Sequence, residues 1–564
     1  MRNKIYYILG ILILGPLFIL LNTTKNSSST DARVAAHEVP FSRGVNFSGW
    51  FTFFSAQNIQ FQRFGDQDFI DVKRLGIDVV RLPINIHNMT AGPPDYIIAP
   101  LLLKLLDHAV DLAEKHGIYI ILDNHPYDSH GIPPTTEHTR EILLKIWPQM
   151  AEHFKNRGKY VLYEILNEPN GIAASQWGHI QDEAIEAIRR IDQKHTLIVG
   201  GTDWNSVDGL LALPKYADQN LIYTFHFYDP PIFTHQGASW LSPSLTPLSG
   251  VPFPYDSKRM PRTPDVLRGT SAESALKNYA NEAALSVLTR QINRAVAFSR
   301  RRNVPVFCGE FGVLMTHSPS EDRVRWYKFI CDTLDQRRIP RTSWDYYNEF
   351  GIFKTPDSSN FNADLNIDLV RALGFTPPPQ RTGPLEPLKS GFTLYDDYFS
   401  RGYKAVAYGQ ESIFDMYDTA AAEGEYAIRW GNLRQYDNFQ VDFERNNVDL
   451  SYLVQSGYGL EFKARSDKPV RFSVWFQNPE EASSLPWRMR YTVDSTLLPP
   501  DGKWHAIRIP LSSMRDGGAW VQATRKWFDP QNKFSWSQVH KLVFSADFDC
   551  KDCTIWFDSI KVVR

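Results

Sequence analysis

A chain of 564 residues is longer than one ordinary domain, and its 43% hydrophobic and 22% charged composition is that of a folded protein, so two folded units are expected. With 61 Lys and Arg against 63 Asp and Glu, the formal net charge is −2, which speaks against nucleic acid and against strongly basic partners. A neutral ligand suits this balance best.

The N-terminus has the pattern of a secretion signal. Arg2 and Lys4 precede an uncharged apolar run from Ile5 to Leu21, and a polar stretch rich in Asn, Thr and Ser follows. We therefore expect residues 1–39 to be a signal peptide or a membrane anchor with a polar linker. The run is near the lower length limit for crossing a bilayer, so cleavage and membrane attachment both stay open. In either case the protein is expected to be exported: secreted, periplasmic or membrane-anchored.

Residues 40–375 alternate short β-branched or aromatic runs with amphipathic stretches, which is the pattern of βα units around a parallel sheet. Eight strands are expected, at residues 43–51, 77–86, 118–126, 160–169, 196–204, 221–230, 304–313 and 341–353. Helices such as 101–116, 140–155, 176–192 and 275–302 fall between most of them. Eight such units predict an α/β fold, a (β/α)8 TIM barrel.

A long segment, residues 230–270, follows the sixth predicted strand. It is rich in Pro, Ser and aromatic residues and has little periodicity, so we expect a loop that lines a cleft. Within it, Trp240 would either contact a substrate or pack the loop down.

Residues 376–390 (TPPPQRTGPLEPLKS) predict a stiff, Pro-rich linker. Beyond it, residues 391–564 contain short alternating segments between turn residues and no long helical pattern, which predicts a β-sandwich. Cys550 and Cys553 form a C-x-x-C at an expected hairpin tip, and a local disulfide is favoured over zinc because no second pair supplies ligands. Cys308 and Cys331 are expected to be ordinary buried thiols.

Two of the predicted barrel strands end in a glutamate. Asn167-Glu168-Pro169 closes the fourth strand, and Pro169 should end the ladder and restrict Glu168 to extended backbone geometry. Gly309-Glu310-Phe311 closes the seventh. Because these strand ends meet at one face of a barrel, the two carboxyl groups should face one cleft. Glycoside hydrolysis needs such a pair: one acid to protonate the leaving oxygen and one carboxylate to attack or support the anomeric carbon.

Other strand ends carry polar or aromatic side chains: Arg81, His125, His226 with Tyr228, and Trp344. If Arg81 and Tyr228 lie beside Glu310, charge and hydrogen bonding would favour its ionised form. Glu168, beside the neutral Asn167, could hold a raised pKa and donate a proton. Each motif alone has an ordinary structural explanation, but their common position and their order argue for one site. The sequence offers no phosphate-binding loop, metal-ligand triplet or Ser-His-Asp arrangement, so neither a metal nor a nucleotide cofactor is expected.

Together these motifs resemble glycoside hydrolase family 5, the cellulase-like members of the 4/7 barrel enzymes, over roughly residues 40–375. The resemblance implies that Glu168 is the acid/base and Glu310 the nucleophile, about 5–5.5 Å apart, and that the configuration is retained. It also implies substrate-binding or supporting roles for Arg81, His125, Asn167, His226, Tyr228 and Trp344. Asn167 would bind the sugar 2-hydroxyl, and Trp344 would stack on the sugar at the cleavage point.

The resemblance implies a β-linked polysaccharide without choosing its linkage. We expect a monomeric endo-β-1,4-glucanase; the alternatives are a β-1,3-glucanase, a mannanase, a xyloglucanase or an exo-acting glucosidase. The C-terminal region resembles carbohydrate-binding β-sandwich modules, in which a Trp could present a face to a sugar or belong to the core: Trp430, Trp475, Trp487 or Trp520. A hypothesis of another class is a non-catalytic glycan-binding surface protein, against which the presence of both carboxylates speaks.

Overall fold

The computed structural model describes residues 38–564 except 127–134, 357, 382, 384–385, 410, 444–446, 481–483 and 523. The apolar run of the expected signal or anchor lies outside the described residues. Within the described part of the chain, no helix is long and apolar enough to cross a membrane. These residues form one compact unit.

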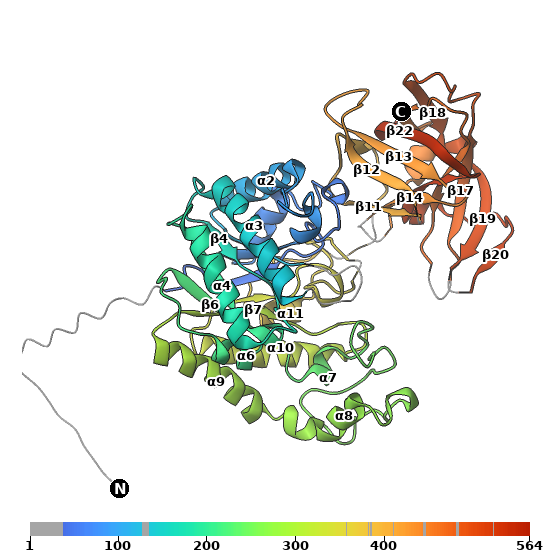
Figure 1. The fold of residues 1–564 in the computed structure, drawn as a ribbon. Coiled ribbons are helices and arrows are strands. Elements are labelled where there is room, and N and C mark those ends of the chain that lie inside the picture. The colour runs from blue at the N-terminus through green and yellow to red at the C-terminus, as the bar shows by residue number, and fades with distance from the viewer. Residues whose placement is uncertain are drawn as a thin grey trace, which may run out of the picture. The chain divides into compact units, whose positions relative to one another are not determined.

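Eight parallel strands close into the predicted barrel (Figure 1). They are β1 (Arg43–Asn46), β2 (Val79–Ile84), β3 (Tyr119–Asn124), β4 (Val161–Glu164), β5 (Thr196–Gly200), β6 (Leu221–Phe227), β7 (Val306–Phe311) and β8 (Arg341–Ser343). Each strand pairs with the next, and β8 returns to β1. The TIM-barrel prediction is confirmed. Every strand is shorter than predicted, because the last residues of each predicted run belong to the loop that follows.

Helices cover the outside of the barrel (Figure 1). They are α1 (Asp66–Arg74), α2 (Pro100–His116), α3 (Thr136–Phe154), α4 (Ala174–Arg189), α5 (Thr202–Asn205), α6 (Val207–Ala212), α7 (Pro231–Thr234), α8 (Ser271–Glu282), α9 (Leu285–Arg302), α10 (Ser320–Asp335) and α11 (Ile367–Ala372). The prediction of one helix over residues 275–302 is wrong. The chain breaks between α8 and α9 at Ala283 and Ala284, where Ala284 is extended. Because Ala is the best helix former, the sequence gives no sign of this break.

The barrel interior has an apolar layer near the N-terminal ends of the strands. Its side chains come from six strands and from Phe41: Val79, Ile121, Leu162, Ile198, Ile222 and Phe307. Side chains two residues further along a strand point to the same side. Arg81, Asp123 and Glu164 therefore follow Val79, Ile121 and Leu162 into the interior, above the apolar layer, and all three are fully buried.

The C-terminal region is the predicted β-sandwich, built from two antiparallel sheets. Its strands are β9 (Phe392–Asp396), β10 (Tyr398–Phe399), β11 (Tyr403–Tyr408), β12 (Ile413–Asp418), β13 (Ala427–Leu433), β14 (Asn438–Phe443), β15 (Gly459–Arg465), β16 (Phe472–Gln477), β17 (Trp487–Val493), β18 (His505–Pro510), β19 (Arg515–Val521), β20 (Lys526–Phe528), β21 (Lys541–Ala546) and β22 (Cys550–Val563). The first sheet has the order β10-β9-β22-β13-β12, with β15 and β18 attached through β22. The second has the order β11-β14-β21-β16-β17-β19-β20. A short helix, α12 (Ser451–Gln455), precedes β15.

Aromatic side chains from both sheets form the sandwich core, with Phe439 and Phe544 of the second sheet packed against Phe557 of the first. Trp430 and Trp487 belong to this core, with 0% and 4% of their surface exposed. The suggestion that either could offer a face to a sugar is therefore wrong.

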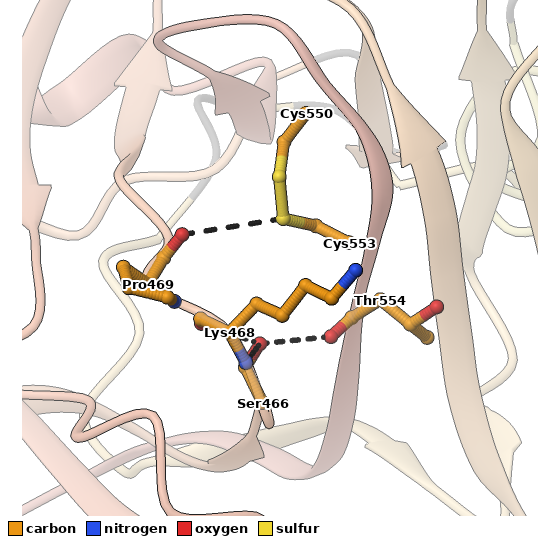
Figure 2. Close-up of a disulfide and its surroundings, with 6 residues drawn as sticks. All are labelled: Ser466, Lys468, Pro469, Cys550, Cys553 and Thr554. Carbon is orange, nitrogen blue, oxygen red and sulfur yellow. Dashed lines mark hydrogen bonds between the residues drawn. A yellow bond between two sulfur atoms is a disulfide. The ribbon is translucent and has the colours of Figure 1, made fainter.

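Cys550 and Cys553 form the local disulfide that the sequence favoured over zinc (Figure 2). Beside it, the Ser466 hydroxyl donates a hydrogen bond of 3.0 Å to the carbonyl oxygen of Thr554. The expected hairpin tip is wrong, because β21 and β22 belong to different sheets and the disulfide lies where the chain crosses between them. Cys308 and Cys331 are free, buried thiols, as predicted.

Candidate active site

A buried arginine lies at the centre of the predicted site. The Arg81 guanidinium donates to both oxygens of Glu164, at 2.7 and 2.9 Å, and to Oε1 of Glu310 at 2.6 Å. Its Nη2 also donates to Oδ1 of Asn167 at 2.9 Å and lies 3.0 Å from Oδ2 of Asp123. One side chain thus joins carboxylates from β3, β4 and β7. Burial raises the pKa of Glu164, although the charge of Arg81 opposes this.

Glu310 is held at both carboxylate oxygens. Arg81 donates to Oε1, and the Tyr228 hydroxyl donates to Oε2 at 2.9 Å. Its side chain is only 5% exposed. These two donors fix the orientation of the carboxylate, and they are the two neighbours that the sequence analysis considered for Glu310.

Glu168 has a different environment. The His226 Nδ1–H donates to its Oε1 at 2.7 Å, and the side chain is 27% exposed. The loss of surrounding water raises the pKa of Glu168 to about 7, although the charge of Arg81 opposes this. Burial lowers the pKa of His226 to about 4, so its imidazole is neutral and its Nδ1 carries a hydrogen for the bond. A proton held near neutral pH is what a general acid requires.

The backbone of Glu168 contradicts the sequence prediction. We expected Pro169 to restrict it to extended geometry, but its φ of 44° lies in the left-handed region. A residue with a β-carbon adopts this region at a cost of about 1–3 kcal/mol and keeps it only where its surroundings hold it. The hydrogen bond from His226 holds the side chain in place.

The two glutamates lie close together. One ligand atom from each of Glu168, His226 and Glu310 lies within 4.8 Å of the other two, so a carboxyl oxygen of Glu168 is at most 4.8 Å from one of Glu310. Among the described residues, these three are also the side chains that could hold a metal ion. Because His226 already bonds to Glu168, the group is explained without an ion, and the expectation that no metal is needed stays a prediction.

A second hydrogen-bonded chain fixes Asn167. Burial lowers the pKa of His125 to about 4, so its ring is neutral. Its Nδ1–H donates to Asp123 at 2.7 Å, and its Nε2 accepts from the Asn167 amide at 3.0 Å. Burial raises the pKa of Asp123 to about 7, opposed by the charge of Arg81. With Arg81 bound to its oxygen, the Asn167 amide is fixed at both ends.

Aromatic rings stand around these polar groups. Trp344 is half-buried and stacks on His125 with a centroid distance of 5.6 Å. Trp240 is 57% exposed, and its ring centroid is 6.4 Å from Phe350, a neighbour of Tyr228. The 230–270 segment thus brings an exposed indole to the region of the site.

Sequence reasoning missed several residues of this site. Asn46 ends β1, accepts from Arg81 at 3.0 Å and donates to the carbonyl of Gly309 at 3.2 Å. Asp123 and Glu164 bind Arg81, and neither is among the residues that the sequence analysis singled out. The two-residue period of β3 and β4 could have indicated both, because each follows an inward apolar residue by two.

The turn that follows β5 was also missed. Asp203, Trp204 and Asn205 all have positive φ, of 58°, 53° and 52°, and the sequence gives no sign of this turn. It places the Asn205 amide 3.4 Å from Nε2 of His226 and leaves the Trp204 side chain 55% exposed.

Residues 36–350 match the family described as Cellulase (glycosyl hydrolase family 5), which is more than half of the chain. Endoglucanase 3 of Fibrobacter succinogenes is 29% identical over 357 residues, covering 59% of this chain and 52% of that relative. The match thus spans about half the length of that relative. Endoglucanase C of Acetivibrio thermocellus is 25% identical over 320 residues, covering 55% of this chain and 92% of that relative. Among solved structures, a hyperthermophilic endo-β-1,4-glucanase with bound substrate shares the fold, with a TM-score of 0.50 and 23% identity over 59% of this chain and 97% of that one.

Proposed function

Since the chain belongs to glycosyl hydrolase family 5, the cellulases, we propose that this glycosyl hydrolase is an endo-β-1,4-glucanase that acts by double displacement with Glu168 and Glu310. The observation that carries the proposal is the separation of at most 4.8 Å between a carboxyl oxygen of Glu168 and one of Glu310. Inverting enzymes hold their carboxyl groups roughly 6.5–9.5 Å apart to leave room for a water molecule, so the shorter gap favours retention.

In the first step, the Glu310 carboxylate attacks the anomeric carbon while Glu168 gives its proton to the glycosidic oxygen. The bond to the leaving sugar breaks, and a bond from Glu310 to the anomeric carbon forms. The pKa of about 7 for Glu168 keeps its proton available in neutral solution. Arg81 and Tyr228 position the attacking carboxylate through its two oxygens.

In the second step, Glu168, now ionised, takes a proton from water as the water oxygen attacks the anomeric carbon. The bond to Glu310 breaks, which restores both side chains and leaves the product with the configuration of the substrate. Asn167 has an amide fixed by Arg81 and His125, and we assign it to the sugar hydroxyl next to the reacting carbon. Trp344, stacked on His125, is assigned to the sugar ring at the cleavage point.

The choice of β-1,4-glucan is supported by the endoglucanase relatives of the barrel region. The exposed rings of Trp204 and Trp240 are further candidates for contact with sugars on either side of the cleaved bond. A β-1,3-glucanase, mannanase, xyloglucanase or exo-acting glucosidase would use the same two carboxylates, so only products and substrate preference separate them.

Export is part of the same proposal. The apolar run from Ile5 to Leu21 after Arg2 and Lys4 supports it, and so does the disulfide between Cys550 and Cys553, since disulfides persist mainly in oxidising compartments. Detection of the protein outside the cytoplasm, and N-terminal sequencing of the exported form, would test this and show whether the run is cleaved.

The test of the activity compares the wild type with Glu168→Gln, Glu310→Gln and the exposed control Glu141→Gln on barley β-glucan, carboxymethylcellulose, laminarin, mannan and xyloglucan. We expect preference for the β-1,4-linked glucans and losses in kcat of at least about 10³-fold for the first two variants only. Proton NMR of early products should show the β-anomer first. Equal activity in all four proteins, or an α-anomer first, would overturn the proposal.

A further measurement separates the two carboxylates. An aryl β-cellobioside with an acidic phenol as leaving group needs little protonation, so Glu168→Ala should form the covalent intermediate nearly normally, while Glu310→Ala should not. A burst of phenol from the first variant and none from the second is expected. The reverse pattern would exchange the two roles.

A further inference from the structure

The outer face of the second sandwich sheet carries a group of aromatic side chains around one arginine. Buried Trp487 of β17 lies directly opposite buried Ala519 of β19, so the residues that follow each of them, Arg488 and Trp520, point outward on the same face. Trp527 of β20 is the direct cross-strand partner of Trp520. These strands form one edge of the sheet (Figure 1).

Arg488 is clamped between two indole rings and, among the described residues, has no carboxylate partner. Its Cζ lies 4.8 Å from the ring centroid of Trp475 and 4.7 Å from that of Trp527. Its Nε is buried without a hydrogen-bond partner, and in the described part of the chain no carboxylate pairs with it. Burial and the charge of Arg490 lower the pKa of Arg488 to about 10. Its outer N–H groups are thus held by the rings and remain available to a ligand.

Two of the indole rings are fixed by the same kind of hydrogen bond, from the indole N–H to the Gln two residues further along the chain. On β16, the Trp475 indole N–H donates to the side-chain oxygen of Gln477 at 3.2 Å, and on β19 the Trp520 indole N–H donates to Gln522 at 2.9 Å. With its only donor used, each indole can offer only its apolar faces. Trp520 and Trp527 are 40% and 46% exposed. Exposed, oriented rings of this kind suit a flat ligand that has an apolar face and hydroxyls at its rim.

Two of the cations near these rings are paired with carboxylates of the same domain. Arg490 is paired with Asp547 at 3.1 Å, and Lys541 of the neighbouring strand is paired with Asp442 at 3.4 Å. The face therefore offers aromatic area together with the donors of Arg488. Pyranose rings of a neutral polysaccharide have the matching chemistry.

We propose that the surface formed by Trp475, Arg488, Trp520 and Trp527 binds a neutral β-glucan chain. Pyranose rings stack on Trp520 and Trp527, and Arg488 donates to their hydroxyls. The choice of glucan rests on the proposed function, because the polymer held here is then the one that the barrel cleaves.

The experiment measures retardation of the full chain in native gels that contain barley β-glucan. All proteins carry Glu310→Ala so that the polymer stays intact. The parent is compared with Trp520→Ala/Trp527→Ala and with Arg488→Met, which keeps the apolar stem between the rings. The matched control is Trp504→Ala/Trp556→Ala, whose indoles flank Arg465 at 5.4 and 4.1 Å. Trp556 lies on β22 of the other sheet, and Trp504 directly precedes β18 of that sheet.

We expect the first double variant and Arg488→Met to raise the dissociation constant for β-glucan at least about tenfold, with the control within about twofold of the parent. Near-ultraviolet circular dichroism checks that the sandwich stays folded; should the double variant unfold, Arg488→Met and the single variant Trp520→Ala decide. Unchanged retardation in the folded variants, equal loss in the control, or retardation by polygalacturonate but not by β-glucan would overturn the inference.

The same proteins separate this inference from the proposed function. With Glu310 restored, hydrolysis of soluble cellohexaose should be the same with and without Trp520 and Trp527, because the barrel site is intact. If the wild type cleaves no glucan while retardation still depends on these rings, the proposed function fails and the glucan-binding face stands. If cleavage is normal and retardation is the same with and without Trp520 and Trp527, the glucan-binding face is wrong and the proposed function stands.

Discussion

Glu168 and Glu310 have the same side chain but lie in different surroundings in this barrel. Glu310 accepts from Arg81 and Tyr228 and is almost fully buried, whereas Glu168 accepts from a neutral His226 and has a pKa raised to about 7. In the proposed mechanism, these different environments divide one pair of carboxyl groups into a nucleophile and an acid. The division depends on the protonation of histidine as much as on the glutamates, since a charged His226 would favour loss of the proton from Glu168.

The raised pKa of Glu168 predicts the basic limb of the pH profile. The acid must be protonated, so kcat/KM should fall as pH rises through about 7. The measurement is kcat/KM on cellohexaose between pH 4 and 10 at constant ionic strength. Glu168→Ala, assayed on an aryl cellobioside with an acidic phenol, should lose this limb. A limb that persists unchanged in that variant would assign it to another group.

The raised pKa of Glu168 also makes the free energy of unfolding depend on pH. Between pH 4.5, the ordinary value for Glu, and about 7, the folded protein holds a proton on Glu168 that the unfolded chain has released. This group therefore lowers the free energy of unfolding as pH rises through that window.

Arg81 is predicted to be the most sensitive residue of the site. Arg81→Met leaves Asp123, Glu164 and Glu310 buried without their common cation, so the free energy of unfolding should fall by about 3–5 kcal/mol. Arg81→Lys keeps the charge but not the two bonds to Glu164 and should lose less. Urea unfolding measures both. A Met variant as stable as the wild type would show that the three carboxylates are neutral in the folded protein.

At the scale of elements, strand alternation and helix ends determine where the chemistry lies. Strands β2, β3 and β4 each contribute one residue to the apolar layer of the barrel. Two residues further along, the same strands contribute Arg81, Asp123 and Glu164 to the polar layer above it. The helices return the chain to the next strand, and α2 does so through Gly117, which has a φ of 61°.

Gly117 gives a prediction for this turn. A β-carbon there would lie 3.3 Å from the Tyr160 hydroxyl, in a backbone conformation that costs roughly 1–2 kcal/mol for most residues. Gly117→Ala should therefore lower the free energy of unfolding by about that amount. Gly117→Asn should lose less, because Asn tolerates this conformation, as Asn303 does at the end of α9. Equal losses in the two variants, measured by urea unfolding, would show that contact with Tyr160 dominates.

At the scale of the whole molecule, the barrel carries the candidate catalytic residues and the sandwich carries the aromatic surface around Arg488. The disulfide belongs to the sandwich alone and closes a loop with only two residues between Cys550 and Cys553. So short a loop limits what the bond can contribute, because the entropy of the unfolded chain falls little when it closes.

Removal of the disulfide tests whether the activity of the barrel is independent of the stability of the sandwich. Cys550→Ala/Cys553→Ala should lower the stability of the sandwich by about 2 kcal/mol and leave hydrolysis of soluble cellohexaose unchanged. Calorimetry of the full chain measures the first effect and the rate of cellohexaose cleavage the second, with dithiothreitol-treated wild type as the matched control. A loss of activity in parallel with the sandwich transition would show that the barrel depends on it.

The sequence by itself determined the barrel, the sandwich and the positions of the site residues along the chain. Eight runs of β-branched or aromatic residues, six of them with a polar or aromatic candidate at the strand end, carry that information locally, through side-chain period and strand-end chemistry. The resemblance based on Arg81, His125, Glu168 and Glu310 placed the chain in the family that the comparison then matched.

Only the tertiary structure decided what depends on several segments at once. The meeting of Asp123, Glu164 and Glu310 on one arginine is a contact between four strands, and no local pattern encodes it. The left-handed φ of Glu168 contradicts the local preference of a residue before proline and is held by a histidine 58 residues away. Likewise, the sequence made Trp430 and Trp520 equal candidates for a sugar-binding face. The packing of the two sheets buries Trp430 and exposes Trp520. Burial depends on which other segments cover a side chain, so the local sequence does not determine it.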